Sequence, residues 1–219
     1  LAAEQGYAKA QCDLGMIYDR GDGVPSDYEE ALKWYKLAAA QNNSEAQYNI
    51  GYIYYRGNGV AKDFKEAAHW FKLAAEQDDV KAQHNLGYIY HNGEGVPQDY
   101  EEAFKWYKLA AQQNAPITQH NLGLMYQNGN GVQQDYKKAA HWYKLAAKQG
   151  YAEAQCDLGM LHSEGKGVPQ DNEESLKWYI SAAEQGYAAA QYSLGVAYRL
   201  GHGLQKDDKQ AVKWYTIAA

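Results

Sequence analysis

The chain of 219 residues lacks a long apolar run, and it lacks an excess of positive charge. No stretch approaches the ~20 consecutive apolar residues of a membrane-spanning helix. Lysine and arginine number 21 against 27 acidic residues, which gives a formal net charge of −6. Nucleic acids and anionic membrane surfaces select basic stripes or polybasic segments. We therefore expect neither a nucleic-acid partner nor a membrane span.

The residues that are present recur at a fixed interval of 36 positions. The pattern Gln-x-x-Leu-Gly, with isoleucine in one copy, starts at Gln11, Gln47, Gln83, Gln119, Gln155 and Gln191. All six tryptophans keep the same step, from Trp34 to Trp214. Periods of this length indicate stacked supersecondary units that are stabilised by contacts between neighbours. The sequence therefore predicts one elongated array rather than one or two globular domains.

We expect six copies, and the chain starts with residues that match the end of another copy. Leu1–Gly6 repeats the end of a unit, which we interpret as the tail of a preceding repeat in a longer protein. The predicted repeats of this single array over 1–219 span about 7–42, 43–78, 79–114, 115–150, 151–186 and 187–219.

One unit is predicted to hold two helices. Apolar and small residues at helical spacing indicate a first helix from about Ala8 to Arg20, which ends at Gly21-x-Gly23. Asp27 is expected to cap the second helix, with Glu30 completing a capping box. Glycine inside a helix costs roughly 1 kcal/mol against alanine. We expect Gly15 to offset that cost because it faces Ala31 of the second helix and lets the two helices approach closely.

The shared pattern, Ala-x-x-x-Leu-Gly-x-x-Tyr-x-x-Gly-x-Gly-Val-x-x-Asp-Tyr-x-x-Ala-x-x-Trp-Tyr-x-x-Ala-Ala, resembles the Sel1-like repeat, a relative of the tetratricopeptide repeat. The resemblance covers the whole chain. It implies an all-α, right-handed superhelical solenoid of antiparallel helix pairs, with the first helix of each pair on the inner surface. It also implies a non-catalytic adaptor or scaffold that binds a protein or peptide in its concave groove, without cofactors.

If the resemblance holds, four positions of each first helix point inward, those of Lys9, Cys12, Met16 and Asp19 in the first copy. They share one helix face. Tyrosine and histidine gather there in the second and third copies, and such rings make good interface anchors. The partner-binding residues that we predict are Tyr48, Tyr52, Tyr55, His84, Tyr88, His91, His120 and Leu124. The alternative is that these rings merely fill the inner surface.

Asn49, Asn85 and Asn121 follow the second inward position in three copies. They have the groups to hydrogen-bond a bound backbone, but a tie to the neighbouring helix is the simpler interpretation. Cys12 and Cys156 occupy one position of the first and fifth copies, too many helix layers apart for a disulfide between them. They are expected to be free thiols or to pair between molecules. The histidines show no spacing that predicts a metal site.

Two rival functions remain open. Ser163-x-x-Lys166 matches the serine signature of penicillin-recognising enzymes, although neither Ser-Asp-Asn nor Lys-Thr-Gly accompanies it. Some cysteine-rich relatives of the repeat are linked to β-lactam binding, which makes a hydrolase or β-lactam-binding protein the alternative. The other hypothesis is end-to-end self-assembly, because arrays without polar caps stack.

Overall fold

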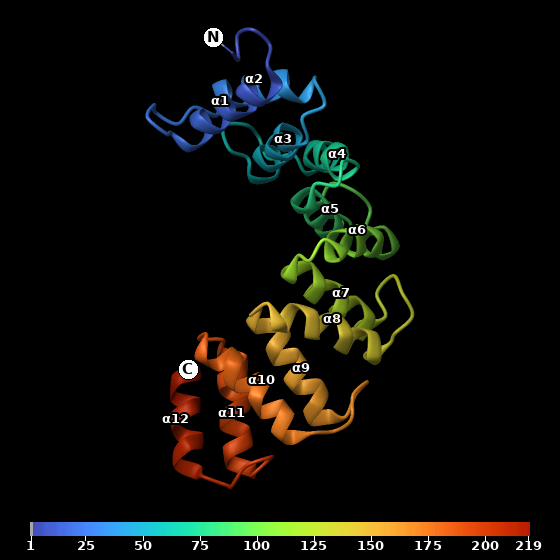
Figure 1. Ribbon diagram of the computed structural model, residues 1–219, viewed down its shortest axis with the longest axis vertical. Helices are drawn as coiled ribbons and strands as arrows, with labels where there is room; N and C mark the ends of the chain where they lie inside the picture. The colour runs from blue at the N-terminus through green and yellow to red at the C-terminus, as the bar shows by residue number, and fades with distance from the viewer. Residues whose placement is uncertain (1) are drawn as a thin grey trace. The chain divides into compact units, whose positions relative to one another are not determined.

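The computed structural model describes residues 2–219, which fold into twelve α-helices joined by short loops (Figure 1). Consecutive helices pair, so the predicted all-α solenoid of helix pairs is confirmed. The helices are α1 (Ala8–Arg20), α2 (Tyr28–Ala39), α3 (Ser44–Arg56), α4 (Phe64–Ala75), α5 (Val80–Asn92), α6 (Tyr100–Gln112), α7 (Pro116–Asn128), α8 (Tyr136–Lys148), α9 (Ala152–Glu164), α10 (Asn172–Glu184), α11 (Ala188–Leu200) and α12 (Asp208–Ala218).

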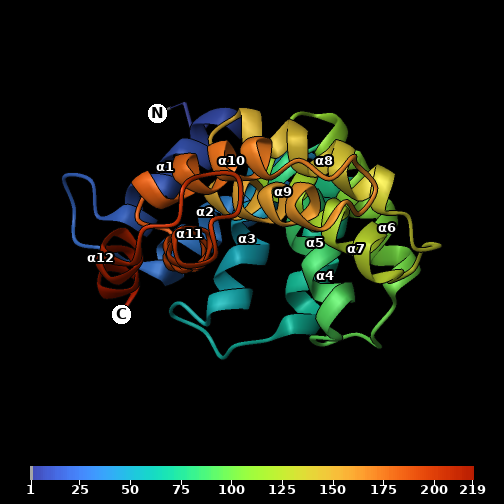
Figure 2. The same ribbon diagram turned by 90° about the horizontal axis from the view of Figure 1, so that it is seen from below.

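The chain divides into two compact units, Leu1–Gln113 with α1 to α6 and Asn114–Ala219 with α7 to α12. Within each unit, the two helices of a pair pack against each other, and the second helix of a pair also packs against the first helix of the next pair. The loop inside a pair is the longer one. Figure 2 shows the loop between α3 and α4 running beyond the ends of both helices.

Backbone chemistry explains where the helices start and end. The first helix ends as predicted, since Gly21 adopts φ 78° and its N–H donates to the carbonyl of Ile17. Asp27 caps α2 by accepting from the N–H groups of Glu29 and Glu30. The prediction that Glu30 completes a capping box is wrong. The Asp27 N–H donates to the Tyr18 carbonyl at 2.9 Å across the loop, and the Glu30 carboxylate pairs with Lys33 instead.

The glycine of the repeated motif faces a ring rather than an alanine. A methyl group on Gly15 would lie 2.6 Å from Cδ1 of Tyr35, so the nearest neighbour is this ring and not the expected Ala31; in the fifth copy the carbonyl oxygen of Ser175, the equivalent of Ala31, also lies 3.1 Å from such a methyl group on Gly159. The same clash would occur at every copy, against Phe71 in the second and against tyrosine in the others. The glycine thus makes room for the aromatic core of each helix pair.

The glutamine of the same motif joins neighbouring repeats. The Gln83 side chain is fully buried; its Nε2 donates to the Ala75 carbonyl at the end of the preceding repeat, at 3.2 Å. Its Oε1 accepts from Nε2 of Gln113 at the end of its own repeat, at 3.0 Å. The second of these contacts recurs for Gln11, Gln47, Gln119 and Gln155, at 2.7 to 2.8 Å. We call this arrangement the glutamine clasp.

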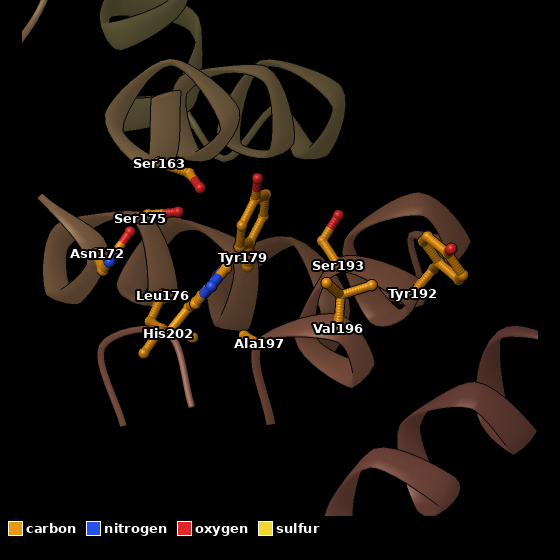
Figure 3. A pocket seen from close by; sticks show the side chains of 10 residues that line it. All are labelled: Ser163, Asn172, Ser175, Leu176, Tyr179, Tyr192, Ser193, Val196, Ala197 and His202. Atoms are coloured by element: carbon orange, nitrogen blue, oxygen red, sulfur yellow. The ribbon is translucent and has the colours of Figure 1, made fainter. Parts of the chain in front are cut away.

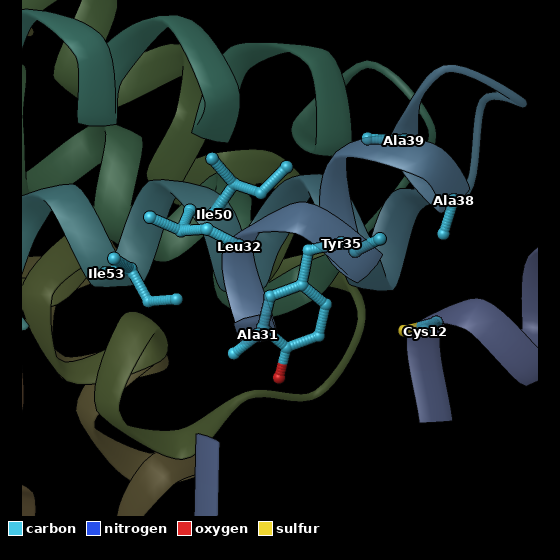
Figure 4. Packing of buried hydrophobic residues seen from close by; sticks show 9 residues of the cluster. Cys12, Ala31, Leu32, Tyr35, Ala38, Ala39, Ile50 and Ile53 are labelled. Atoms are coloured by element: carbon cyan, nitrogen blue, oxygen red, sulfur yellow. The ribbon is translucent and has the colours of Figure 1, made fainter. Parts of the chain in front are cut away.

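The hydrophobic core runs between consecutive helices. In the first cluster, Tyr35 and Ala31 of α2 are fully buried together with Cys12 of α1 and Ile50 of α3. Figure 4 shows Leu32 of α2 close to Ile50 of the next repeat. The Tyr35 hydroxyl donates to the Asp19 carboxylate at 3.2 Å. Each core therefore belongs to two repeats, and the rings of the second helices occupy its centre.

Candidate partner-binding surface

The second inward position of each first helix packs onto the core ring of its own repeat. The rings of Tyr48 and Phe71 have centroids 5.7 Å apart, and those of His84 and Tyr107 are 5.8 Å apart. In the first copy this position is Cys12, which has no exposed surface. The position therefore belongs largely to the framework of the repeat, which the sequence pattern did not reveal.

The third inward position carries the exposed rings. Tyr52 is 39% exposed and Tyr88 is 40% exposed, although both lie in the middle of well-packed helices. The residues on either side of each, Gly51 and Ile53 or Gly87 and Ile89, are buried. These two tyrosines therefore present ring surface to solvent from a rigid base.

Four rings of α3 and α5 form two pairs that Phe71 of α4 joins, since it contacts both Tyr48 and Tyr55. We call Tyr48, Tyr52, Tyr55 and Tyr88 the tyrosine cluster. Tyr48 stacks on Tyr52 at 6.1 Å, and Tyr55 meets Tyr88 edge-on at 6.5 Å. The Asn85 side chain hydrogen-bonds the Tyr48 hydroxyl, so it ties α5 to α3. The helices of two successive repeats thus place their rings side by side.

Cations and a hollow border the tyrosine cluster. The Arg56 guanidinium lies 5.9 Å from the Tyr52 ring centre, and Lys81 Nζ lies 5.7 Å from that of Tyr48. Beside Tyr48, a hollow of ≈ 470 Å³ extends between Met16, Arg20 and the start of α5. Sequence patterns did not single out Arg56 or Lys81. The 36-residue period nevertheless makes Lys81 equivalent to Lys9 at the first inward position, and Arg56 equivalent to Arg20.

Polar atoms without partners lie beside the cluster. Within residues 2–219, His91 Nδ1 and Glu94 Oε2 are buried and make no hydrogen bond. Burial lowers the pKa of His91, so its ring is neutral at neutral pH. Burial also raises the pKa of Tyr55 to about 12, and the nearby Glu94 carboxylate adds to this effect. Buried polar groups in folded proteins normally have hydrogen-bond partners, and these two atoms are exceptions.

Two of the predicted site residues lie in the second unit, and the structure corrects one of them. His120 is only 8% exposed. Its Nε2 lies 2.7 Å from the Asp157 carboxylate, and its ring packs between Tyr143 and Tyr151. His120 is therefore a packing residue rather than an interface anchor. Leu124 is partly buried against the core of α8 and α9.

The described residues show no metal centre. Across residues 2–219 no group of three or more His, Cys, Asp or Glu side chains could hold an ion. Cys12 and Cys156 are free thiols, and burial raises the pKa of each to about 12. Over the same residues, no helix has the length and apolar character to cross a membrane.

The Ser163-x-x-Lys166 match does not form a serine–lysine pair. The helix ends at Glu164, and Lys166 Nζ contacts the Glu164 carboxylate at 2.8 Å. The same ammonium lies 5.7 Å from the ring centre of Tyr136. The lysine is thus engaged with two groups other than the Ser163 hydroxyl.

Stacked helix pairs that repeat one sequence pattern define a helical-repeat protein. More specifically, the chain belongs to the Sel1 repeat family. The family pattern matches residues 8–43, 44–79, 80–114, 116–151, 152–187 and 188–219. Proteins of this family commonly mediate protein–protein interactions and are generally non-catalytic.

Solved structures with the same fold come from bacteria. One is a protective antigen of uropathogenic Escherichia coli, with 38% identity and a TM-score of 0.94 over 99% of this chain. Another is a Sel1 repeat protein of Oxalobacter formigenes, with 36% identity and a TM-score of 0.85; the match covers 98% of this chain and 86% of that one. The chain spans only 46% of the Escherichia coli protein. Comparison with curated proteins gives no significant match.

Proposed function

We propose that this protein is a non-catalytic scaffold that binds a peptide segment or a helix of a partner protein on the first-helix surface of α1, α3 and α5. The observation that carries the proposal is the exposure of Tyr52 and Tyr88 on a rigid base. Exposed aromatic patches usually mark contact sites, and tyrosine loses little conformational entropy on binding.

The surroundings of the tyrosine cluster support this function. Arg56 and Lys81 cover the edges of two rings, and the adjoining hollow has room for a side chain of a bound segment. Tyr48 and Tyr55 support the exposed tyrosines, and His84 and His91 pack beneath this surface against Tyr107. Leu124 stays a predicted contact residue of the second unit, while the buried His120 takes no direct part.

The test compares two double variants. Tyr52→Ala with Tyr88→Ala removes the exposed rings of the first helices, and Leu37→Ala with Leu109→Ala removes similarly exposed side chains of the second helices. A partner captured from extract with the wild-type chain is purified, and its affinity for each variant is measured. Two central anchors at about 1–2 kcal/mol each predict a loss of roughly 30-fold or more for the tyrosine variant alone.

Circular dichroism and melting serve as controls for folding. Both variants are expected to keep wild-type helicity, because the substituted side chains lie outside the core clusters. Full affinity of the tyrosine variant, together with lost affinity of the leucine variant, would move the site to the second helices.

A further inference from the structure

The fifth and sixth repeats depart from the other copies at four polar positions. Ser163 stands where the other copies carry Asp, Tyr, His, Gln or Arg, and Asn172 replaces the ring found in the first four. Ser175 is the one serine at a position that is otherwise alanine, and Ser193 replaces asparagine or aspartate. In sequence these are scattered substitutions toward small polar side chains.

The structure brings all four to one cavity. A space of ≈ 240 Å³ is lined by Ser163 at the end of α9, Asn172 and Ser175 of α10, and Ser193 of α11 (Figure 3). This space equals the volume of roughly eight water molecules. Three departures from the common residue type, together with a serine at the variable position of Ser163, place small polar side chains around this space and leave it open.

The second and third repeats show that a pair of aromatic rings can fill the equivalent space. There, the positions of Ser163 and Asn172 hold Tyr55 and Phe64, with ring centroids 5.3 Å apart, or His91 and Tyr100, 5.1 Å apart. Both pairs meet edge-on. Replacement of such a pair by serine and asparagine leaves a hole in a frame that accommodates aromatic rings.

The cavity has one polar wall and one apolar wall. Figure 3 shows the hydroxyls of Ser163, Tyr179 and Ser193 along one side, with Leu176 and Val196 on the other. The Tyr179 hydroxyl lies near the Ser175 and Ser193 side chains, and Ser193 Oγ donates to the Ala189 carbonyl at 2.9 Å. The ten lining residues include no lysine or arginine, so an anionic ligand would find no counter-charge. A neutral ring that carries one hydroxyl matches both walls.

We propose that this cavity binds a phenol ring, either as a free small phenol or as the tyrosine side chain of a bound peptide. The ring would lie against Leu176 and Val196 in the place of the absent ring pair, and its hydroxyl would join the Ser163, Ser175 and Ser193 hydroxyls. The site lies in α9 to α11 and does not depend on the tyrosine cluster of α3 and α5.

Isothermal titration calorimetry of the intact chain tests this proposal. The probes are p-cresol for a free phenol, N-acetyltyrosinamide for a peptide tyrosine, and toluene as the ring without a hydroxyl. We expect p-cresol to bind at least ~10-fold more tightly than toluene, because a site with buried hydroxyls discriminates against a ligand that leaves them unpaired. Binding of N-acetyltyrosinamide as well identifies a peptide as the source of the ring, and binding of p-cresol alone identifies a free phenol.

Three variants locate the binding. Ser163→Tyr with Asn172→Phe rebuilds the ring pair of the second repeat and is expected to abolish p-cresol binding and to raise the melting temperature. Arg199→Tyr with Asp208→Phe makes the same change at the exposed equivalent positions of the sixth repeat and is expected to leave binding intact. Ser175→Ala restores the residue of the other copies, which preserves the fold, and is expected to weaken p-cresol binding several-fold.

Absence of p-cresol binding to the wild-type chain would overturn the proposal. Equal affinity for toluene, or undiminished p-cresol binding in both the filled variant and Ser175→Ala, would do the same. The Tyr52→Ala/Tyr88→Ala variant is expected to bind p-cresol like the wild type, so that failure here is distinct from failure of the proposed partner surface.

Discussion

At the scale of single residues, the repeated glycine and the ring opposite it act as one unit. Gly87 has the Tyr107 ring over it, and a methyl group there would lie 2.6 Å from Cδ1 of that ring. Tyr107 is buried with Ala103 and Ala110 of α6, so it has little room to move. The rigid ring makes this glycine a packing requirement, which outweighs its poor helix propensity.

Gly87→Ala is therefore expected to destabilise the protein by about 1–3 kcal/mol, despite the better helix propensity of alanine. Urea denaturation followed by circular dichroism measures the change. Gly87→Ala combined with Tyr107→Leu is expected to cost less than the sum of the two single changes, because the smaller side chain relieves the clash. Strict additivity would show that the glycine and the ring do not interact.

Also at the scale of single residues, His91 makes the stability of the protein depend on pH. Burial lowers its folded-state pKa from 6.5, and His84 is shifted in the same direction. As the pH falls, the unfolded chain takes up these protons first. The stability that the neutral imidazoles contribute is present above pH 6.5 and is lost as the pH falls through the lower folded-state pKa values.

We expect the free energy of unfolding to decline as the pH falls below about 6.5, and the decline to be smaller in His91→Gln. Glutamine stands at the equivalent position of the fourth repeat, Gln127, so the fold tolerates it. Urea titrations at several pH values measure the slope. His141→Gln, which changes an exposed histidine, is the matched control and should keep the wild-type slope.

At the scale of helices, the glutamine clasp explains why the motif contains glutamine. The Gln83 side chain reaches a backbone carbonyl of the preceding repeat and the Gln113 amide of its own repeat, while fully buried. Gln83→Ala removes two hydrogen bonds and leaves a cavity, which together cost about 1–3 kcal/mol, although the Ala75 carbonyl still accepts from the Asp78 N–H and Gln113 still donates to the Asp78 carbonyl. Gln112→Ala, an exposed change in the neighbouring position, is expected to cost under about 0.5 kcal/mol.

A double-mutant cycle with Gln113→Ala isolates the clasp. The coupling energy between Gln83 and Gln113 is expected to reach at least about 0.5 kcal/mol, since the two side chains share one hydrogen bond inside the protein. Denaturation midpoints of the four proteins measure it. A coupling indistinguishable from zero would assign the cost of Gln83→Ala to lost packing alone.

The sequence predicted helix positions better than helix contacts. The first helix runs from Ala8 to Arg20 as expected, because a glycine in the left-handed region and an aspartate cap act locally. A 36-residue period says which residues are equivalent, but not what they touch. It therefore placed Gly15 against Ala31 instead of the Tyr35 ring. It also gave Asp27 a capping box, although the Tyr18 carbonyl already takes its N–H.

The same limit applies to the candidate site. Exposure at Tyr52 and Tyr88 follows from the predicted face, but His120 lies on that face too and is buried. His120 occupies the second inward position, which packs on the core ring, here Tyr143, and it also pairs with Asp157 of the next repeat at 2.7 Å. The cavity of the fifth repeat was equally invisible, because its walls come from three helices and a loop of two repeats. Side-chain environments that form between repeats can be recognised only in the three-dimensional structure.

At the scale of the whole molecule, each compact unit carries its own cores. The first unit holds the clusters of α2 with α3 and of α4 with α5, and the second holds those of α8 with α9 and of α10 with α11. In repeat arrays, stability is approximately a sum over repeats and their neighbouring interfaces. A cut that leaves these clusters whole should therefore leave two folding units.

Fragments 1–113 and 114–219 are accordingly expected to be helical and to unfold cooperatively by themselves, as measured by circular dichroism and urea denaturation. A cut at residue 78 is the control, because it separates Ala67, Phe71 and Ala74 of α4 from Leu86 and Ile89 of α5, which share one core. Fragment 1–78 should melt at a lower temperature than fragment 1–113, and it exposes the α4 side chains of that core. Equal melting of these two fragments would mean that the core between α4 and α5 adds nothing to the stability of the unit.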